Sequence, residues 1–262
     1  SHGTLAVVGG QAGMEGAALL AARTALLSGS GKVFLGWTQN AEALRVDPLH
    51  PELMLRPVEA LLRQHATLGI NSWAIGCGMG MTQQAQDWLT RLLAQTARHA
   101  LVLDADALNL IAQANGVPQA LLDRAQPAVL TPHPLEAARL LGCSVKTVQA
   151  DRVGSALELA RRFHAVVVLK GAGTVLANPQ AHWAINTSGN PGLASAGTGD
   201  VLSGLIGSLA AQGLEPWDAA RAGVWLHGAA ADHCVARGVG PIGLRATELQ
   251  TAIRLLLNQP HS

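Results

Sequence analysis

A glycine-rich loop that leads into a carboxylate is the stretch of this sequence best suited to chemistry. Gly197, Thr198 and Gly199 end the loop, and Asp200 follows at the start of an apolar helical pattern. Glycines leave backbone N–H groups open to a polyanion, and the first turn of a helix adds unpaired N–H groups and a partial positive charge. The loop therefore predicts a phosphate or oxyanion site at these three residues.

Asp200 needs a separate explanation, because a carboxylate beside a phosphate cradle repels the ligand. A chemical role resolves the conflict, since the carboxylate can take the proton of a hydroxyl that attacks a phosphoryl group. The alternative is that Asp200 only caps the helix. The glycines around it favour the catalytic role.

Polar residues also follow three apolar runs that predict buried strands. Residues 101–103, 128–130 and 166–169 form these runs. The polar residues that come after them are Asp104, Asp106, Asn109, His133, Glu136 and Lys170. In doubly wound sheets, ligands bind outside the carboxyl ends of the strands. These six residues are therefore candidates for a site, and their alternatives are structural.

The structural alternatives differ from residue to residue. Asp104 or Asp106 could cap a helix predicted at residues 107–114. Two prolines fix the direction of His133, but an isolated loop histidine is often only solvated. His227 and His233 stand six apart on one predicted helix, hence on different faces, which favours core or surface positions over metal binding.

The run Lys170-Gly171-Ala172-Gly173-Thr174 indicates a nucleotide-binding site, because it offers a cation and exposed N–H groups to a phosphate chain at the end of a strand. It is not a P-loop, since the lysine precedes the glycines and no helix follows. Residues 174–177 and 182–185 predict a hairpin there instead. Residues 9–16 resemble a dinucleotide fingerprint only loosely, and we interpret them as a substrate-facing turn.

The elements that must position these residues alternate along the chain. Strand patterns and helical patterns follow one another, which predicts an α/β fold with a mostly parallel sheet. The expected helices lie at residues 15–27, 58–65, 107–114, 136–141, 146–163, 217–235 and 246–257, with one more after residue 80 that includes residues 85–93. The helix after Asp200 is expected to be buried, with Gly204 and Gly207 admitting a close neighbour. Residues 40–57 are expected to be a connection over the sheet edge.

Composition excludes several classes of protein. The chain has 262 residues and is 49% hydrophobic, which is enough for a hydrophobic core. Its formal net charge of +1 lacks the positive excess that binding to nucleic acid or a membrane surface requires. Aromatic residues make up 3%, which argues against base stacking. Three separate cysteines argue against a zinc site or a disulfide framework and indicate the cytoplasm. We expect no membrane span and no signal peptide, and the abrupt start is typical of a cut at a domain edge.

Four motifs occur in a fixed order: VLDADALN, TPHPLE, VVLKGAGTV and NTSGNPGLASAGTGDVLSG. With them the chain resembles the ADP-dependent NAD(P)H-hydrate dehydratases, which repair hydrated nicotinamide cofactors and belong to the ribokinase-like superfamily. The resemblance implies one domain, residues 1–262, folded as a three-layer α/β/α sandwich. It also implies a homo-oligomer, commonly a homotetramer. In that family this domain is often fused to an NAD(P)H-hydrate epimerase domain.

The resemblance also assigns roles to residues. It places Lys170, Gly171, Ala172, Gly173 and Thr174 against the adenine nucleotide, with Gly199 at its phosphates. It makes Asp200 the catalytic carboxylate, and it places Ala17, Gly78 and His133 against the hydrated nicotinamide nucleotide. The further candidates are Asp104, Asn109, Glu136, Asn186 and Asn190. The chain departs from the family pattern at Leu135, usually glycine, and at GCGMG (residues 76–80), where GPGLG is commoner, and both departures concern local backbone shape.

The expected reaction uses ADP as phosphoryl donor. Asp200 would deprotonate the C6 hydroxyl of NADHX or NADPHX, the hydroxyl would attack ADP, and phosphate would then leave from C6. Mg²⁺ would help neutralise the phosphates, although no carboxylate cluster marks its site. Two alternatives stay open: a kinase for a small vitamin precursor, which stops at the phosphate ester, and a nucleotide sensor without turnover.

Overall fold

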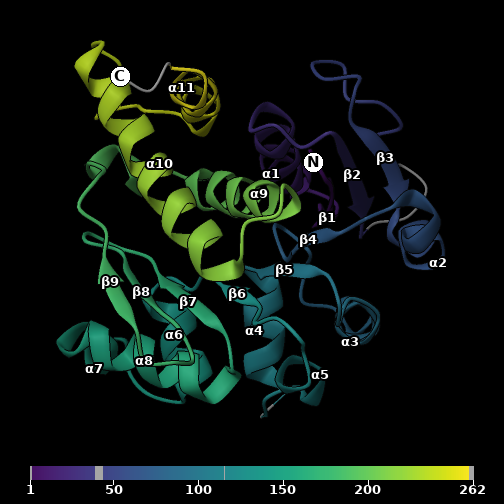
Figure 1. Ribbon diagram of the computed structural model, residues 1–262, viewed down its shortest axis with the longest axis horizontal. Helices are drawn as coiled ribbons and strands as arrows, with labels where there is room; N and C mark the ends of the chain where they lie inside the picture. The colour runs from purple at the N-terminus through teal and green to yellow at the C-terminus, as the bar shows by residue number, and fades with distance from the viewer. Residues whose placement is uncertain (1, 39–43, 115, 260–262) are drawn as a thin grey trace.

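A nine-stranded sheet crosses the molecule in the order β3-β2-β1-β4-β5-β6-β7-β8-β9 (Figure 1). The structure, a computed structural model, describes residues 2–38, 44–114 and 116–259. All pairs from β3 to β7 are parallel, and the pairs β7-β8 and β8-β9 are antiparallel. The bounds of the strands are β1 Thr4–Gly9, β2 Lys32–Trp37, β3 Met54–Pro57, β4 Ser72–Ile75, β5 Ala100–Leu103, β6 Val129–Leu130, β7 Val166–Leu169, β8 Val175–Ala177 and β9 Trp183–Ile185. The mostly parallel sheet and its terminal hairpin confirm the prediction.

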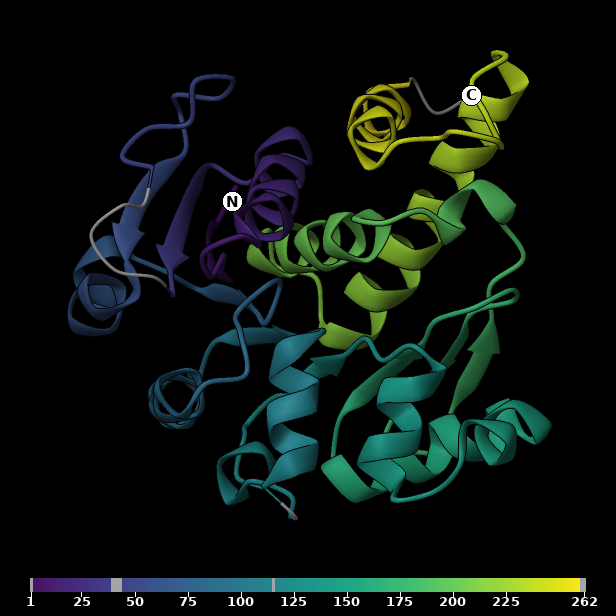
Figure 2. The same ribbon diagram turned by 180° about the vertical axis from the view of Figure 1, so that it is seen from behind.

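Helices cover both faces of this sheet, as Figures 1 and 2 show from opposite sides. One layer consists of α1 Glu15–Leu27, α9 Thr198–Ala211, α10 Pro216–Ala236 and α11 Ala246–Leu257. The other consists of α2 Val58–Leu68, α3 Gln83–Gln95, α4 Asp106–Gln113, α5 Gln119–Leu122, α6 Pro134–Leu141, α7 Val145–Ala150 and α8 Arg152–Phe163. A short 3-10 helix, η1, spans Pro191–Ala194. The predicted three-layer α/β/α sandwich is therefore confirmed.

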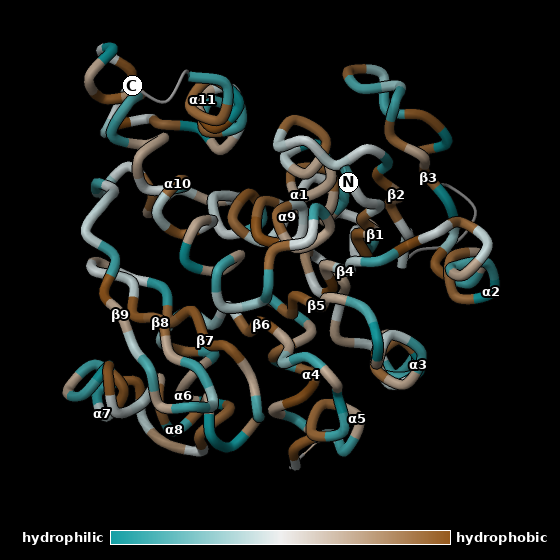
Figure 3. Tube along the Cα trace, viewed as in Figure 1, coloured by the Kyte–Doolittle hydropathy of each residue, from teal (hydrophilic) through white to brown (hydrophobic). Residues whose placement is uncertain are grey.

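Alternation along each strand builds two separate cores. On β1, Leu5 and Val7 pack into the core under α1 and α9, whereas Ala6 and Val8 pack into the core on the opposite face. A strand that is buried on both faces has no polar face, which is why the strands appear as continuous apolar runs. Figure 3 shows the same pattern as brown segments along the central strands. None of the helices in the described part of the chain is long and apolar enough to cross a membrane.

Two sequence predictions about single elements are wrong. Residues 40–57 are not only a connection, because Met54–Pro57 form the edge strand β3 beside β2, while residues 39–43 lie outside the described part. This strand is only half-buried and ends in proline, which an edge strand tolerates. Residues 146–163 are two helices rather than one, because the chain turns at Asp151, whose side chain caps α8 by accepting from the N–H of Gly154 at 2.8 Å.

The helix after Asp200 is buried along nearly its whole length and packs against α1 (Figure 1). A Cβ atom added to Gly204 would lie 2.1 Å from the carbonyl oxygen of Ala21 on α1. No side chain fits at that distance without moving a backbone. The prediction that Gly204 admits a close neighbour is confirmed, and this contact sets how closely α9 packs against α1.

We expect Gly204→Ala to lower the free energy of unfolding by about 1–3 kcal/mol, because the methyl group must push α1 and α9 apart. Urea unfolding of the wild type and the variant measures the loss. Gly16→Ala is the matched control, since Gly16 is an exposed residue of α1 with no atom within 4 Å of its added Cβ. The control should be neutral or slightly stabilising. Equal stability of the two variants would contradict the packing argument.

Candidate active site

Two cavities open beside the carboxyl ends of β5, β6 and β7. The first, which we name the Asp200 cavity, has a volume of about 550 Å³ and includes Asp104, His133, Glu136, Lys170 and Asp200 in its lining. The second, the KGAGT cavity, has a volume of about 440 Å³ and is lined by residues 170–174, by residues 186–191 and by parts of α9 and α10. The residues that line both cavities are Lys170, Gly171, Leu193, Ala194, Thr198 and Gly199. A ligand group can therefore touch both spaces at the start of α9.

Lys170 lies at this junction and is held by Asp104. Its Nζ atom donates to Asp104 Oδ1 at 2.7 Å and lies 4.0 Å from Glu136 Oε2. Burial lowers the pKa of Lys170, but the charges of Asp104 and Glu136 outweigh burial and hold the pKa above its ordinary value. The lysine therefore stays cationic, and the exposed 21% of its side chain presents that charge to the cavities.

Asp104 is a buried anchor rather than a helix cap. Besides Lys170, its carboxylate accepts from Ser203 Oγ at 2.6 Å and from the N–H of Ala105 at 2.8 Å. Helix α4 begins at Asp106, with Ala105 at its N-cap position and no capping side chain, and the Asp106 carboxylate instead accepts from the N–H of Gly80 at 2.8 Å. The capping alternative for Asp104 and Asp106 is therefore wrong.

Asp200 lies in the first turn of α9 and lines the cavity that carries its name. Gly197 takes the N-cap position with φ of 85°, and α9 has no side-chain cap, so Asp200 is not a capping residue. Burial and the charge of Asp104 raise the pKa of Asp200 to about 6. The nearby Cys77 thiol lowers this pKa, but its effect is smaller. A carboxylate with this pKa is ionised at neutral pH and is still basic enough to accept a proton.

His133 is the N-cap residue of α6, so the alternative of a merely solvated loop histidine is wrong. Its Nδ1 atom accepts from the N–H groups of Leu135 at 3.1 Å and Glu136 at 3.3 Å. The Glu136 carboxylate in turn accepts a hydrogen bond from the backbone N–H of His133 at 2.8 Å. Its Oε1 atom lies 3.3 Å from His133 Nε2. Since Nδ1 accepts, the ring proton is on Nε2. Burial raises the pKa of Glu136 to about 7.

The side chain of Arg152 binds the carbonyl oxygens of the glycine loop that follows β7. This guanidinium donates to the carbonyl oxygens of Leu169 at 3.1 Å, Lys170 at 3.3 Å and Ala172. Gly171 and Gly173 have φ of 143° and 62°, which a residue with a side chain would resist. With the carbonyl groups turned toward Arg152, the loop backbone can present N–H groups to the KGAGT cavity.

The opposite wall of the KGAGT cavity is a segment of short polar side chains tied to α10. Asn190 donates to Asp232 Oδ1 at 2.9 Å, and the other oxygen of Asp232 accepts from the N–H of Gly189 at 2.7 Å. Asn186 donates to the carbonyl oxygen of Ser188 at 2.9 Å. His227 is buried, as its predicted core position requires, and donates from Nε2 to the carbonyl oxygen of Thr198 at 2.9 Å.

Comparison with known proteins agrees with this geometry. The model of a protein family described as NAD(P)H-hydrate dehydratase matches residues 5–255. The chain belongs to this family. A relative from Neisseria meningitidis serogroup B, named ADP-dependent (S)-NAD(P)H-hydrate dehydratase, is 46% identical over 259 residues, which are 99% of this chain and 86% of the relative. The bifunctional NAD(P)H-hydrate repair enzyme of Escherichia coli K12 is 41% identical, and the match covers 98% of this chain but 48% of that protein.

Solved structures place the fold among the ribokinase-like proteins. The ADP/ATP-dependent NAD(P)H-hydrate dehydratase of Bacillus subtilis, co-crystallised with ATP and Mg²⁺, has a TM-score of 0.85 and 34% identity, and the match covers 97% of this chain and 88% of that one. A hydroxyethylthiazole kinase from Pyrococcus horikoshii has a TM-score of 0.69 at 17% identity, with 97% and 88% covered. At that identity the likeness concerns the fold alone.

The residues that the dehydratase pattern assigns to the nicotinamide side fall in two places. His133 lines the Asp200 cavity, whereas Ala17 and Gly78 are not among its lining residues and lie close to each other, since a Cβ atom added to Gly78 would lie 3.3 Å from Ala17 Cβ. The link between these two places is Cys77, because its buried thiol and the Asp200 carboxylate shift each other's pKa. The departure from the family pattern at GCGMG therefore affects Asp200, the proposed base, through Cys77, and not only the local backbone shape.

Other contacts of the dehydratase site were not found by sequence reasoning. The missed residues are Cys77, Arg152, Ser203 and Asp232. Ser203 offered a weak signal, since it is a polar residue on the buried helix α9. Asn109, a candidate, lies outside both cavities, where Arg139 Nη1 donates to its Oδ1 at 2.6 Å. Among the described residues, no group of three or more His, Cys, Asp or Glu side chains is arranged to hold a metal ion.

Proposed function

We propose that this chain catalyses the ADP-dependent dehydration of (6S)-NADHX and (6S)-NADPHX to NADH and NADPH. The observation that carries the proposal is the junction of the two cavities at Lys170, Thr198 and Gly199, with Asp200 on one side of it. A phosphoryl group that passes from one cavity to the other would meet a cation and the amides of a helix terminus. It would also meet a base whose proton affinity suits the attack of a hydroxyl group.

The proposal places one ligand in each cavity. The adenine nucleotide would lie in the KGAGT cavity, with its terminal phosphate at Gly199. The hydrated nicotinamide ring would lie in the Asp200 cavity beside His133. Support comes from the lining, because the KGAGT cavity has glycine amides and no carboxylate among the described residues that line it. The carboxylates line the Asp200 cavity instead.

The reaction has two steps. Asp200 takes the proton of the C6 hydroxyl, the oxygen attacks the terminal phosphorus of ADP, and the bond between that phosphorus and the oxygen of AMP breaks. Phosphate then leaves C6 with the electron pair of the carbon–oxygen bond, and a proton leaves C5, so that the C5–C6 double bond returns. The departing phosphate takes up one of the two protons and the other passes to water, so hydrate and ADP become NADH or NADPH, AMP, phosphate and a proton. Lys170 and the amides of residues 198–199 stabilise charge on the transferred group.

Magnesium would accompany the nucleotide. Mg²⁺ is commonly held by substrate phosphates, water and one or two carboxylates. The oxygens of Asp104 already accept from Lys170, Ser203 and Ala105, so they do not form a ready magnesium site. The other carboxylates that line the Asp200 cavity are Glu136, which accepts from the N–H of His133 and lies 4.0 Å from Lys170 Nζ, and Asp200, which the proposed chemistry uses as a base. The ion would supply only charge neutralisation of the phosphates.

The direct test is incubation of the protein with hydrated NADPH and either ADP or ATP, followed by the absorbance of the reduced nicotinamide. Recovery of NADPH together with AMP or ADP supports the proposal. A vitamin-type kinase, the alternative of the same fold, would instead leave a stable phosphate ester when given its own substrate and would recover no NADPH. A nucleotide sensor would bind ADP and convert nothing.

The pH dependence should report the ionisation of Asp200. The base must be unprotonated, and the pKa of Asp200 is raised to about 6, so kcat/KM is expected to fall about tenfold for each unit of pH below 6. Cys77→Ala removes a thiol that lowers this pKa, so its acid limb should move to higher pH, with Cys77→Ser nearer the wild type. A wild-type acid limb near pH 4 would contradict the assignment of the base.

We also propose that the enzyme acts in the cytoplasm as a homo-oligomer, such as a tetramer. Support comes from exposed apolar side chains of β9 and α10, since Trp183, Ile185 and Trp225 are each at least half exposed. Light scattering on a sizing column measures the oligomeric state. The chain spans about half the length of the relatives named bifunctional NAD(P)H-hydrate repair enzymes, and this supports the proposal that its parent chain carries the epimerase domain that the resemblance implies.

A further inference from the structure

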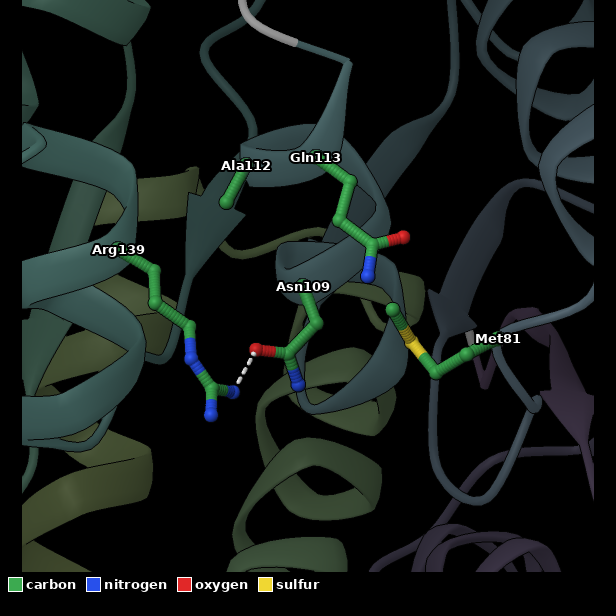
Figure 4. A pocket seen from close by; sticks show the side chains of 5 residues that line it. All are labelled: Met81, Asn109, Ala112, Gln113 and Arg139. Carbon is green, nitrogen blue, oxygen red and sulfur yellow. Dashed lines mark hydrogen bonds between the residues drawn. The ribbon is translucent and has the colours of Figure 1, made fainter.

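A third cavity lies outside the two that form the proposed site. It has a volume of about 490 Å³ and is lined by Met81, Asn109, Ala112, Gln113 and Arg139. We name it the Arg139 cavity. In Figure 4, Asn109, Ala112 and Gln113 stand along α4, with Arg139 reaching over from α6 on one side and Met81 on the other.

The Arg139 cavity continues the Asp200 cavity along two helices. Ala105 and Glu136 line the Asp200 cavity, and Asn109 and Arg139, which follow them by four and three residues, line the Arg139 cavity. Residues three or four apart on a helix share a face and are separated by about 5 Å along the axis. Helices α4 and α6 pack against each other, so both lead from one cavity to the next.

The lining of the Arg139 cavity suits an anion. Arg139 donates to Asn109 Oδ1 at 2.6 Å, and within the described parts of the chain no carboxylate lies at ion-pair distance from its guanidinium. An arginine has five N–H donors in a planar fork, which leaves most of them for a ligand. The amides of Asn109 and Gln113 can add donors. The described lining residues include no acid that would repel a phosphate.

We propose that the Arg139 cavity binds a phosphate group of the dinucleotide substrate. This inference rests on the proposed function, which puts the hydrated nicotinamide ring in the Asp200 cavity. The phosphates of a nicotinamide dinucleotide lie beyond the ribose, away from the ring, and need a cation outside the reacting space. Lys170 is engaged by Asp104 at the cavity junction, whereas Arg139 is held toward the adjoining cavity by Asn109. Met81 and Ala112 supply an apolar wall for the neighbouring sugar.

Arg139→Gln tests the proposal, because it keeps much of the side-chain length and removes the charge. KM for hydrated NADPH is expected to rise about tenfold, the loss of one charge-assisted hydrogen bond at a partly exposed site. The values of kcat and of KM for ADP should stay within about twofold of the wild type. Arg161→Gln is the matched control, since it loses the same charge at an exposed arginine on α8 whose one ion-pair partner among the described residues is Glu158 of the same helix.

Three ligands identify the phosphate. Hydrated NADH and hydrated NADPH share the pyrophosphate, so an equal rise in KM assigns Arg139 to it, whereas a rise for hydrated NADPH alone assigns Arg139 to the ribose phosphate. Hydrated reduced nicotinamide riboside has no phosphate, so Arg139→Gln should leave its KM unchanged. An equal rise for the riboside, or no rise for either dinucleotide, would overturn the proposal.

Calorimetry separates this inference from the proposed function. NADPH should bind the wild type about tenfold more tightly than Arg139→Gln, whether or not the protein dehydrates a hydrate. If turnover is absent but this difference is present, the phosphate site stands and the proposed reaction fails. If turnover is present and the difference is absent, the reaction stands and the phosphate site fails.

Discussion

Asp200→Asn is expected to lower kcat by about 10²–10⁴ with little change in the affinity for ADP, because asparagine cannot take the proton of the C6 hydroxyl. The amide occupies the same place in the first turn of α9, so the glycine loop and Lys170 keep their geometry. Recovery of NADPH from the hydrate measures turnover, and calorimetry measures ADP binding. Turnover within a few-fold of the wild type would remove Asp200 from the mechanism.

Asp106→Asn provides the matched control for this substitution. Asp106 lies outside both proposed cavities, and its carboxylate accepts from the N–H of Gly80, a bond that an asparagine oxygen can also accept. The variant loses the same charge near the site, and it should keep near wild-type kcat. Its acid limb should move to slightly lower pH, because the charge of Asp106 contributes to the raised pKa of Asp200. A collapse of activity in both variants would point to net charge and away from a specific base.

The stability of Asp200→Asn gives an independent readout. The pKa of Asp200 is about 6 in the folded protein and 3.8 for an unperturbed aspartate, so the folded state binds more protons between these values. The ionisation of Asp200 therefore lowers the free energy of unfolding of the wild type as the pH rises from about 4 to 6, and the loss persists above pH 6. Asparagine does not titrate, so the variant should be at least as stable as the wild type at pH 8 while its turnover is lost.

The sequence predicts the central part of the fold because burial on both faces leaves a strong pattern there. β1, β4, β5 and β7 are short, mostly apolar runs that are almost completely buried, because helices cover both faces of the sheet there. At the edge the pattern weakens. β3 is half-buried and ends in proline, so its sequence predicts a connection rather than a strand. The break between α7 and α8 depends on one capping bond from Asp151, which helical periodicity does not report.

The candidate site divides in the same way. Asp104, His133, Lys170 and Asp200 each follow a strand or a glycine loop, so their places at one sheet edge could be predicted. Their bonding partners could not, because packing brings those partners together from distant segments. Ser203 reaches Asp104 across 99 residues, and Arg152 reaches the loop after β7 from the start of a separate helix. The role of Cys77 also depends on packing, since nothing in GCGMG places its thiol beside Asp200.

Lys170→Met is expected to lower both kcat and stability. Turnover should fall by about 10²–10³, the effect of removing a preorganised charge from the transferred phosphoryl group. The free energy of unfolding should fall by about 3 kcal/mol, because Asp104, only 2% exposed, loses the cation that pairs with it. Steady-state kinetics and urea unfolding measure the two losses, and Lys146→Met, at an exposed lysine of α7, is the control for lost charge.

The double variant Lys170→Met/Asp104→Asn separates the two roles of the lysine. Asparagine removes the unpaired buried charge. Its Oδ1 can accept from the N–H of Ala105 and its Nδ2 can donate to Ser203 Oγ, which donates to the carbonyl oxygen of Gly199, so stability should return toward the wild type. Turnover should stay low, because the phosphoryl group still lacks its cation. If turnover recovered together with stability, Lys170 would act only by neutralising Asp104. That result would contradict the proposal that phosphoryl transfer takes place at the junction of the two cavities.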